Sequence, residues 1–311
     1  MMSTNPLDSP WHAGELTIQQ HAGVVARMDA VGRRNVRDHM PDQHREFFAQ
    51  LPFVVLGVVD DAGDAWATLR AGQPGFMQSP EPKLLQIALT PDSDDPAYDG
   101  FREGHPLGVL GIELATRRRN RMNGQIVRAT SGQIDIDVRQ SFGNCPRYIL
   151  PRNLRFTRDV RVHGQAKSIE STTLDDSAHT LITNARTFFV TSYADVSDEQ
   201  QHRQVDVSHR GGEAGFVRVN DDGSLTIPDF AGNLFFNTLG NLLLNGRAGL
   251  VFVDFATGGL LQMTGDAEVL LDSVDSSLFP GAERLWRFRP RRVVFRADAL
   301  PMQWEEATAP T

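Results

Sequence analysis

Leu107-Gly-Val-Leu-Gly-Ile-Glu-Leu-Ala-Thr116 returns 141 residues further along the chain as Ala248-Gly-Leu-Val-Phe-Val-Asp-Phe-Ala-Thr257. When the alignment runs from Gly108 to Gly124, five of its 17 positions are identical, and most other strand positions are conservative. Self-similarity at a fixed offset is the signature of a duplicated structural unit. The pattern therefore predicts two copies of one domain.

A second block supports the same duplication. Trp66-Ala-Thr-Leu-Arg-Ala-Gly-Gln-Pro-Gly-Phe76 aligns with Asp206-Val-Ser-His-Arg-Gly-Gly-Glu-Ala-Gly-Phe216 at an offset of 140. The arginine, two glycines and the phenylalanine are identical in the two copies. The alternative is that similar hairpins recur in any β protein. Two blocks that share nearly one register favour duplication.

Short strands dominate both copies. Phe53 to Val59 is apolar and rich in valine, a polar turn follows, and Ala65 to Leu69 resumes the strand pattern, which is typical of a hairpin. Further strands are expected over 107–115, 125–129 and 133–138, and many short strands per copy favour a barrel. Helices are expected near 18–28, 41–48 and 175–185. We expect a mainly β protein with peripheral helices, divided into a helical segment 1–50, a first barrel 51–160 and a second barrel 175–304.

Composition excludes several classes of function. The net charge of −8 argues against sequence-independent binding to nucleic acid. The single cysteine, Cys145, allows no intrachain disulfide and fits a reducing compartment. Apolar runs such as 51–59 are far shorter than the ~20 residues of a membrane helix. No spacing typical of a metal site, a P-loop or a Rossmann fold is present. We expect a cytoplasmic protein without a metal, a membrane or a nucleic-acid partner.

The stretch from Asp206 to Val269 contains the most informative motifs. Ser208-His-Arg-Gly-Gly-Glu-Ala-Gly-Phe216 is followed by Leu225-Thr-Ile-Pro-Asp-Phe-Ala-Gly-Asn-Leu-Phe-Phe-Asn-Thr-Leu-Gly-Asn-Leu-Leu-Leu-Asn-Gly-Arg-Ala-Gly-Leu250 and by Gly259-Leu-Leu-Gln-Met-Thr-Gly265. These motifs resemble the pyridoxamine 5'-phosphate oxidase-like superfamily of FMN-binding split barrels. The resemblance covers most of 50–304, although Asn-Gly at 245–246 stands where Asn-Pro is usual.

The N-terminal half adds to this resemblance. Met40-Pro-Asp-Gln-His-Arg-Glu-Phe-Phe48, Ala115-Thr-Arg-Arg-Arg-Asn-Arg-Met-Asn-Gly124 and Gln140-Ser-Phe-Gly-Asn-Cys-Pro-Arg-Tyr-Ile149 are similar to a bacterial subfamily whose substrate is unsettled. The resemblance implies two tandem split β-barrels. It also implies that a basic strand residue and a helix N-terminus together hold a flavin phosphate.

The chemistry of several residues suits that role. Arg210 with Ser208 offers a fixed cation and a hydroxyl donor. Asn237, Thr238 and Asn241 lie within one turn of a helix start, where free N–H groups and the helix dipole favour an anion. The full set of expected cofactor contacts is Ser208, Arg210, Asn237, Thr238, Asn241, Gln262, Arg117, Arg118, Arg119, Asn144 and Tyr148.

Structural alternatives exist for most of this set. Asn237 or Thr238 could simply cap the helix, and Arg210 could be a solvated strand residue. The basic run 117–121 is expected on a hairpin turn, where it could be solvated or could clamp the phosphate of a flavin or of a second nucleotide. Cys145 has no paired base, so a small buried thiol is favoured over a nucleophile.

The preferred function is a flavin-dependent oxidoreductase, with FMN ahead of FAD as cofactor and a small molecule as substrate or electron donor. Catalytic residues are not assigned, because a flavin carries its own redox chemistry. The alternatives are a non-catalytic flavin or nucleotide carrier, a heme- or tetrapyrrole-binding split barrel, and a barrel pair without a ligand. Gly211-Gly212 replaces an apolar run that ends in lysine in true pyridoxamine phosphate oxidases, so vitamin B6 phosphate is not expected as substrate. A homodimer is compatible with the sequence.

Overall fold

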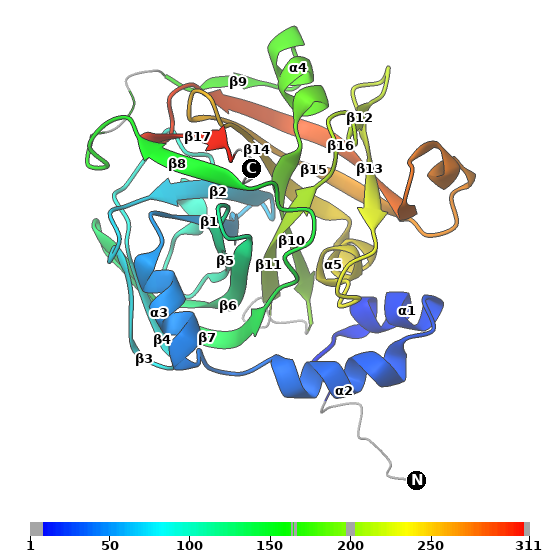
Figure 1. Ribbon diagram of the computed structural model, residues 1–311, viewed down its shortest axis with the longest axis horizontal. Helices are drawn as coiled ribbons and strands as arrows, with labels where there is room; N and C mark the ends of the chain where they lie inside the picture. The colour runs from blue at the N-terminus through cyan, green and yellow to red at the C-terminus, as the bar shows by residue number, and fades with distance from the viewer. Residues whose placement is uncertain (1–8, 163, 165–166, 197–202, 308–311) are drawn as a thin grey trace.

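Two antiparallel sheets account for most of the chain. The computed structural model describes residues 9–162, 164, 167–196 and 203–307 (Figure 1). The first sheet contains β1 (Phe53–Val59), β2 (Ala65–Ala71), β3 (Met77–Glu81), β4 (Leu84–Ala88), β5 (Pro106–Glu113), β6 (Arg118–Ala129) and β7 (Gln133–Gly143). The second contains β10 (Thr187–Asp195), β11 (Arg203–Gly211), β12 (Arg218–Val219), β13 (Leu225–Phe230), β14 (Arg247–Asp254), β15 (Gly259–Leu270) and β16 (Ala282–Arg296), with the short β9 (Ile169–Ser171) paired to β16.

The two sheets share one topology. Their strand orders are β2-β1-β5-β6-β7-β4-β3 and β11-β10-β14-β15-β16-β13-β12, so each strand of the first has a counterpart in the second. Each sheet is followed by a short strand, β8 (Arg152–Phe156) or β17 (Met302–Glu306), and these two pair antiparallel with each other. The expected fold class, a mainly β chain with two tandem split β-barrels, is confirmed.

The inner strands have continuous apolar sequences because they are buried on both faces. In β1, Val54, Leu56 and Val58 point into the core of the first barrel, whereas Phe53 and Val55 point into a core between the barrels. The core between the barrels also receives Phe189, Val207 and Val251 from the second barrel. Alternate side chains along each strand face opposite sides. The two barrels are therefore joined in part by a shared apolar core.

Two glycines of the sequence repeat lie at this interface. A Cβ on Gly108 of β5 would lie 2.8 Å from the backbone nitrogen of Val207 in β11. A Cβ on Gly249 of β14 would lie 2.3 Å from the carbonyl oxygen of Ala65 in β2. Each barrel thus presents a glycine where the backbone of the other approaches. The identity at this position of the repeat follows from a close packing that no side chain permits.

The helices are peripheral. They are α1 (Ala13–His21), α2 (Val25–Asn35), α3 (Asp42–Gln50), α4 (Asp176–Asn184) and α5 (Asn237–Asn245), with two short 3-10 turns, η2 (Tyr98–Gly100) and η4 (Val274–Leu278). The segment expected to be helical near 18–28 is two helices, since Gly23 adopts a φ of +68° between α1 and α2. Helix α1 packs on α5 at one end of the second barrel (Figure 1). Among the described residues, no helix is both long and apolar enough to cross a membrane.

The expectation that the basic run 117–121 lies on a hairpin turn is wrong for most of the run. The turn ends at Arg117, which adopts a left-handed φ of +59°, and β6 already begins at Arg118. Arg119 and Arg121 are consequently strand residues whose side chains share one face. The early start of β6 reflects full pairing with β5, from Glu113–Arg118 down to Pro106–Gln125.

Candidate functional site

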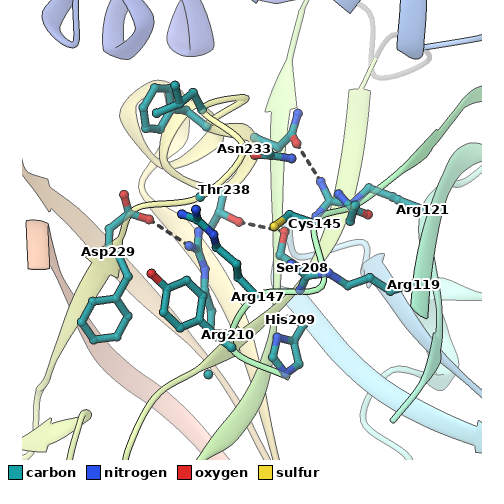
Figure 2. A pocket seen from close by; sticks show the side chains of 18 of the residues that line it. Arg119, Arg121, Cys145, Arg147, Ser208, His209, Arg210, Asp229, Asn233 and Thr238 are labelled. Carbon is teal, nitrogen blue, oxygen red and sulfur yellow. Dashed lines mark hydrogen bonds and ion pairs between the residues drawn. The ribbon is translucent and has the colours of Figure 1, made fainter. Parts of the chain in front are cut away.

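A cavity lined by four guanidinium groups lies between the barrels (Figure 2). This inner cavity has a volume of about 110 Å³. Its arginines are Arg119 and Arg121 from β6 of the first barrel, Arg210 from β11 of the second, and Arg147 from the segment after β7. Both copies of the domain thus contribute to one site.

Strand β11 brings a hydroxyl and a guanidinium to the cavity. Ser208 and Arg210 are two residues apart and therefore face the same side. Nη1 of Arg210 lies 2.8 Å from a carboxylate oxygen of Asp229, whose other oxygen accepts a hydrogen bond from Arg284 at 3.2 Å. Thr238, in the first turn of α5, donates to the hydroxyl of Ser208 at 3.1 Å. Asp229 thus offsets part of the positive charge on this side.

Strand β6 supplies the opposite side. Nη1 of Arg121 lies 3.1 Å from Asp206 and donates to the side-chain oxygen of Asn237 at 2.9 Å. Arg121 also donates to Ser208. Arg119, by contrast, makes no ion pair within the described part of the chain. Burial, together with the charges of Arg121 and Arg210, lowers the pKa of Arg119 to about 10, which still leaves it charged at neutral pH.

Residues 144–150 form a strap that covers the cavity from the first barrel. Cys145, Arg147 and Tyr148 of the strap line the cavity, and Cys145 is half-buried rather than fully buried as expected. Tyr148 adopts a φ of +63°, stacks on Phe230 with ring centroids 5.4 Å apart, and donates from its hydroxyl to the carbonyl of Ala231 at 3.1 Å. The strap is therefore anchored on the second barrel.

Several polar atoms of this cavity are buried without a hydrogen-bond partner. In the described residues these include Nε of Arg119, Arg121 and Arg210, together with Nε2 of His209 and Oδ1 of Asn144. Burial and then the neighbouring charges of Arg119 and Arg210 hold the pKa of His209 well below its usual range, so its imidazole is neutral. Buried polar atoms normally have partners. A concentration of such atoms around one cationic cavity fits an anionic, hydrogen-bonding ligand.

A buried polar network supports the cavity from behind. Asp206 accepts hydrogen bonds from Arg121, from Asn123 at 2.7 Å and from Asn241 at 3.1 Å. Helix α1 extends the network through its N-terminus. His12 bonds to Asn241 at 2.8 Å, and Glu15 accepts from Asn237. Burial, and then the charge of Asp206, raises the pKa of Glu15 to about 8.

A larger and more apolar pocket adjoins the inner cavity. It has a volume of about 930 Å³ and shares Tyr148, Phe216, Pro228 and Phe230 with the inner cavity as lining residues. Its remaining lining includes Val217, Val219 and Phe279. Pockets that bind small molecules usually span ~300–1,000 Å³ and are mainly apolar. The inner cavity alone accommodates a small anion, whereas the two together accommodate a larger molecule.

The structure brings together seven of the eleven residues expected to contact a cofactor. Ser208, Arg210, Asn237, Thr238, Arg119, Asn144 and Tyr148 line the inner cavity. The expected convergence of Asn241 on the same pocket does not occur, because its amide is directed at Ser192 and Asp206 within the buried network. Arg117 and Arg118 line a separate outer pocket instead.

Gln262 does not line the inner cavity. It reaches from the second barrel to a buried polar site of the first barrel, which matches the inner cavity in the repeat. At the offset of the repeat, Gln262 of β15 matches Arg121 of β6, and Thr68 and Arg70 of β2 match Ser208 and Arg210. Gln262 donates to a carboxylate oxygen of Asp95 at 3.0 Å, and Thr68 donates to the other at 2.6 Å. We call the group of Thr68, Arg70, Asp95, Gln262 and Arg296 the sealed site.

Three residues of the inner cavity lie outside the expected set of cofactor contacts. Arg121 belongs to the basic run considered as a phosphate clamp, but that run was expected on a turn, and within it only the match to Gln262 in the repeat distinguishes Arg121. Arg147 lies in the quoted stretch 140–149, but nothing in its spacing shows that the strap crosses to the second barrel. His209 belongs to no motif that marks it as a ligand contact, yet it is 7% exposed and lines the cavity. Within the described residues, no cluster of three or more His, Cys, Asp or Glu side chains could hold a metal.

Comparison with known proteins gives fold-level similarity. No family model matches the chain, and no curated protein matches it. Among solved structures, HupZ of Group A Streptococcus is 15% identical with a TM-score of 0.31, covering 39% of this chain and 92% of that one. The heme storage protein HutZ of Vibrio cholerae is 14% identical with a TM-score of 0.27, covering 40% and 95%. An FAD-binding protein of Mesorhizobium loti is 12% identical with a TM-score of 0.27, covering 41% and 96%. At such identities and scores they carry no functional argument.

Proposed function

We propose that the inner cavity binds the phosphate of a flavin, FMN ahead of FAD, and that the chain is a flavin-dependent oxidoreductase of the pyridoxamine 5'-phosphate oxidase-like type. The proposal rests on one observation above all. Arg119 is held in the cavity without a carboxylate in the described residues, beside further partnerless donors. A phosphate accepts several charge-assisted hydrogen bonds and offsets the excess of positive charge.

Different residues would bind the phosphate and the ring system of the flavin. Arg119, Arg121 and Arg210 would hold the phosphate together with the hydroxyls of Ser208 and Thr238. Tyr148, Phe216 and Phe230 would hold the apolar ring system, since they form the wall between the cavity and the larger pocket. The strap would add Asn144 and Arg147 to the phosphate side. A bound flavin supplies hydride or electron transfer at its ring, and a small molecule is the proposed substrate or donor.

Comparing FMN with riboflavin tests this reading directly, because riboflavin lacks the phosphate. Flavin fluorescence should be quenched on titration, with FMN bound far more tightly than riboflavin. Arg119→Ala should weaken FMN binding by about 10- to 150-fold, which corresponds to roughly 1.5–3 kcal/mol for a charged hydrogen bond. The matched control is Arg128→Ala, on the same strand but 66% exposed and outside the cavity. Equal affinity for FMN and riboflavin, or an unaffected Arg119→Ala variant, would refute the phosphate assignment.

A heme or tetrapyrrole is the second candidate, and one observation favours it. His209 presents a neutral, partnerless imidazole nitrogen to the cavity, and a neutral imidazole is a common ligand of heme iron. The guanidinium groups would then pair with propionates. Visible absorbance of the purified protein, followed by titration with hemin and with FMN, separates the two ligands. A Soret band that His209→Ala abolishes would favour heme over flavin.

A further inference from the structure

A second cationic concavity lies on the outer side of the inner cavity. This outer pocket has a volume of about 550 Å³ and is lined by Asn35, Arg37, Thr116, Arg117, Arg118, Arg119, Asn120, Gly143, Asn144 and Pro146. Four of these residues are arginines, and none is acidic. The outer pocket shares Arg119 and Asn144 with the inner cavity. The two spaces are therefore neighbours across these side chains.

The charge of the outer pocket is not neutralised by any carboxylate among the described residues. Within the described part of the chain, Arg37, Arg117, Arg118 and Arg119 have no carboxylate within ion-pairing distance. Elsewhere arginines are commonly paired, as with Arg70, Arg210 and Arg284. The chain as a whole is acidic, with a net charge of −8. A group of unpaired guanidinium groups in an acidic protein is thus a local feature.

The arginines of the outer pocket are held in place by contacts other than ion pairs. Two backbone hydrogen bonds with Ser141, of 3.1 and 2.7 Å, fix Arg37 beside β7. Arg118 lies over the ring of Phe47 at 4.3 Å and donates to the carbonyl of Gln43 at 3.0 Å. Arg117 lines the pocket from the left-handed turn and is exposed. Positioned cations need less ordering when an anion binds.

We propose that the outer pocket is a second phosphate-binding subsite, which takes a diphosphate group of a nucleotide. A diphosphate carries enough negative charge to pair with several guanidinium groups at once, and arginine forks match phosphate oxygens. The diphosphate has two sources that share this chemistry. It belongs either to the same ligand that fills the inner cavity, as in FAD, or to a separate nucleotide that binds beside FMN. The inference rests on the proposed function only for this relation to the flavin.

Calorimetric titration with inorganic pyrophosphate and with ADP tests the subsite in the full chain. Both should bind the wild-type protein, and Arg37→Gln and Arg117→Asn should each weaken them by about 10-fold. Asparagine is chosen at 117 because it tolerates a positive φ. Both variants should bind FMN within about twofold of wild type, while Arg147→Gln, which changes only the inner cavity, should weaken FMN and leave ADP unchanged. Arg128→Gln serves as the control for net charge.

Preloading the protein with flavin distinguishes the two sources. If ADP binds to FMN-loaded but not to FAD-loaded protein, the subsite takes the second half of a dinucleotide. If ADP binds to both, it takes a separate nucleotide. Absence of pyrophosphate and ADP binding at ~1 mM, a limit of about 4 kcal/mol, would overturn the inference, and so would binding that neither outer variant weakens. ADP binding without FMN binding would refute the proposed function and leave the subsite standing.

Discussion

The inner cavity and the sealed site occupy corresponding positions of the two barrels, yet the positive charge of their arginines is balanced differently. Both contain a strand arginine with a hydroxyl two residues before it, Arg210 with Ser208 and Arg70 with Thr68. In the sealed site the carboxylate of Asp95 is fully buried between Arg70 at 3.4 Å and Arg296 at 3.5 Å. The first barrel thus supplies its own anion.

Within the described residues of the second site, Asp229 pairs with Arg210 and Asp206 with Arg121, whereas Arg119 and Arg147 have no carboxylate partner. The loop that carries Asp95 in the first barrel corresponds to the segment that leads into α5, where Asn237 and Thr238 stand instead. Arg121 replaces Gln262 and adds a further cation. Both arginines of the sealed site are paired with carboxylates, so the unpaired Arg119 and Arg147 of the inner cavity are the groups expected to take an anion from a ligand. The comparison also predicts one flavin per chain.

The residues behind the two sites also differ in polarity. Trp66, fully buried in the first barrel, corresponds to Asp206, the centre of the polar network in the second. Trp66 packs in the apolar core of the first barrel, whereas the hydrogen-bonded carboxylate of Asp206 holds Arg121 at the inner cavity. The strand order is the same in the two barrels, and the residues that differ are those that decide whether the arginines of the site are paired.

The strongest way to break the comparison is to remove the internal anion. Asp95→Ala leaves Arg70 and Arg296 with Asp92 as their remaining carboxylate, removes the acceptor of Thr68, and leaves the amide nitrogen of Gln262 with the carbonyl of Ala67 alone. Loss of one partner of a buried ion pair typically costs about 3–5 kcal/mol, so we expect a loss of this size in the free energy of unfolding from denaturant titration. Asp94→Ala, at the preceding and exposed position of the same loop, should change stability by less than about 0.5 kcal/mol. A loss below about 1 kcal/mol for Asp95→Ala would show that the sealed site is not held by this carboxylate.

The two corresponding arginines sharpen the comparison, because one should affect stability and the other should affect ligand binding. Arg70→Ala removes a cation from a filled site and should destabilise the fold by about 3 kcal/mol while leaving FMN affinity within about twofold. Arg210→Ala should do the reverse, because Arg284 still pairs with Asp229 while the ligand loses a guanidinium. We expect a cost of about 1 kcal/mol in stability and an FMN dissociation constant raised about 10- to 150-fold. If Arg70→Ala alone weakens FMN binding, the functional site lies in the first barrel.

These two sites show what the sequence could and could not predict. The strands of the repeat were predictable because alternation and turn residues are local signals, and Phe53–Val59 coincides with β1. Ser208, Arg210 and Thr238 were predictable from the resemblance. The role of Asp95 was not, because it lies in an aperiodic loop and only the fold brings it to Arg296. Arg147 and the crossing of the strap depend on contact between the barrels, which no local pattern encodes.

The polar network behind the inner cavity should make stability depend on pH. The raised pKa of Glu15, about 8, lies above its ordinary value of 4.5. Its contribution to stability is therefore complete at low pH and is lost as the pH rises from about 4.5 through 8. Glu15→Gln should remove this loss and be the more stable protein at pH 8, with a relative gain on the order of 2 kcal/mol.

Measurement above pH 6.5 isolates this effect. Burial lowers the pKa values of His12 and His209, so these groups affect stability mainly in acid. Unfolding free energies of wild type and Glu15→Gln should be compared at intervals from pH 6.5 to about 8.5, where their difference should grow with pH. Parallel curves would contradict a protonated Glu15. No matching dependence is expected from the first barrel, where Trp66 replaces Asp206.

The smallest expected effect concerns the strap. Tyr148→Phe removes the hydrogen bond from the hydroxyl to Ala231, but it keeps the ring stacked on Phe230. Because Tyr148 is 43% exposed, water compensates for much of the lost bond, and we expect a loss of about 0.5–1 kcal/mol in stability. The effect on the ligand should exceed that on the fold if the strap closes the cavity. Stopped-flow measurement should then show faster FMN dissociation, by about threefold, with little change in the association rate. Tyr148→Ala, which also removes the stacked ring, should accelerate dissociation further. If both variants release FMN at the wild-type rate, the strap does not contribute to retaining the ligand. The inner cavity would then hold its ligand through its arginines alone.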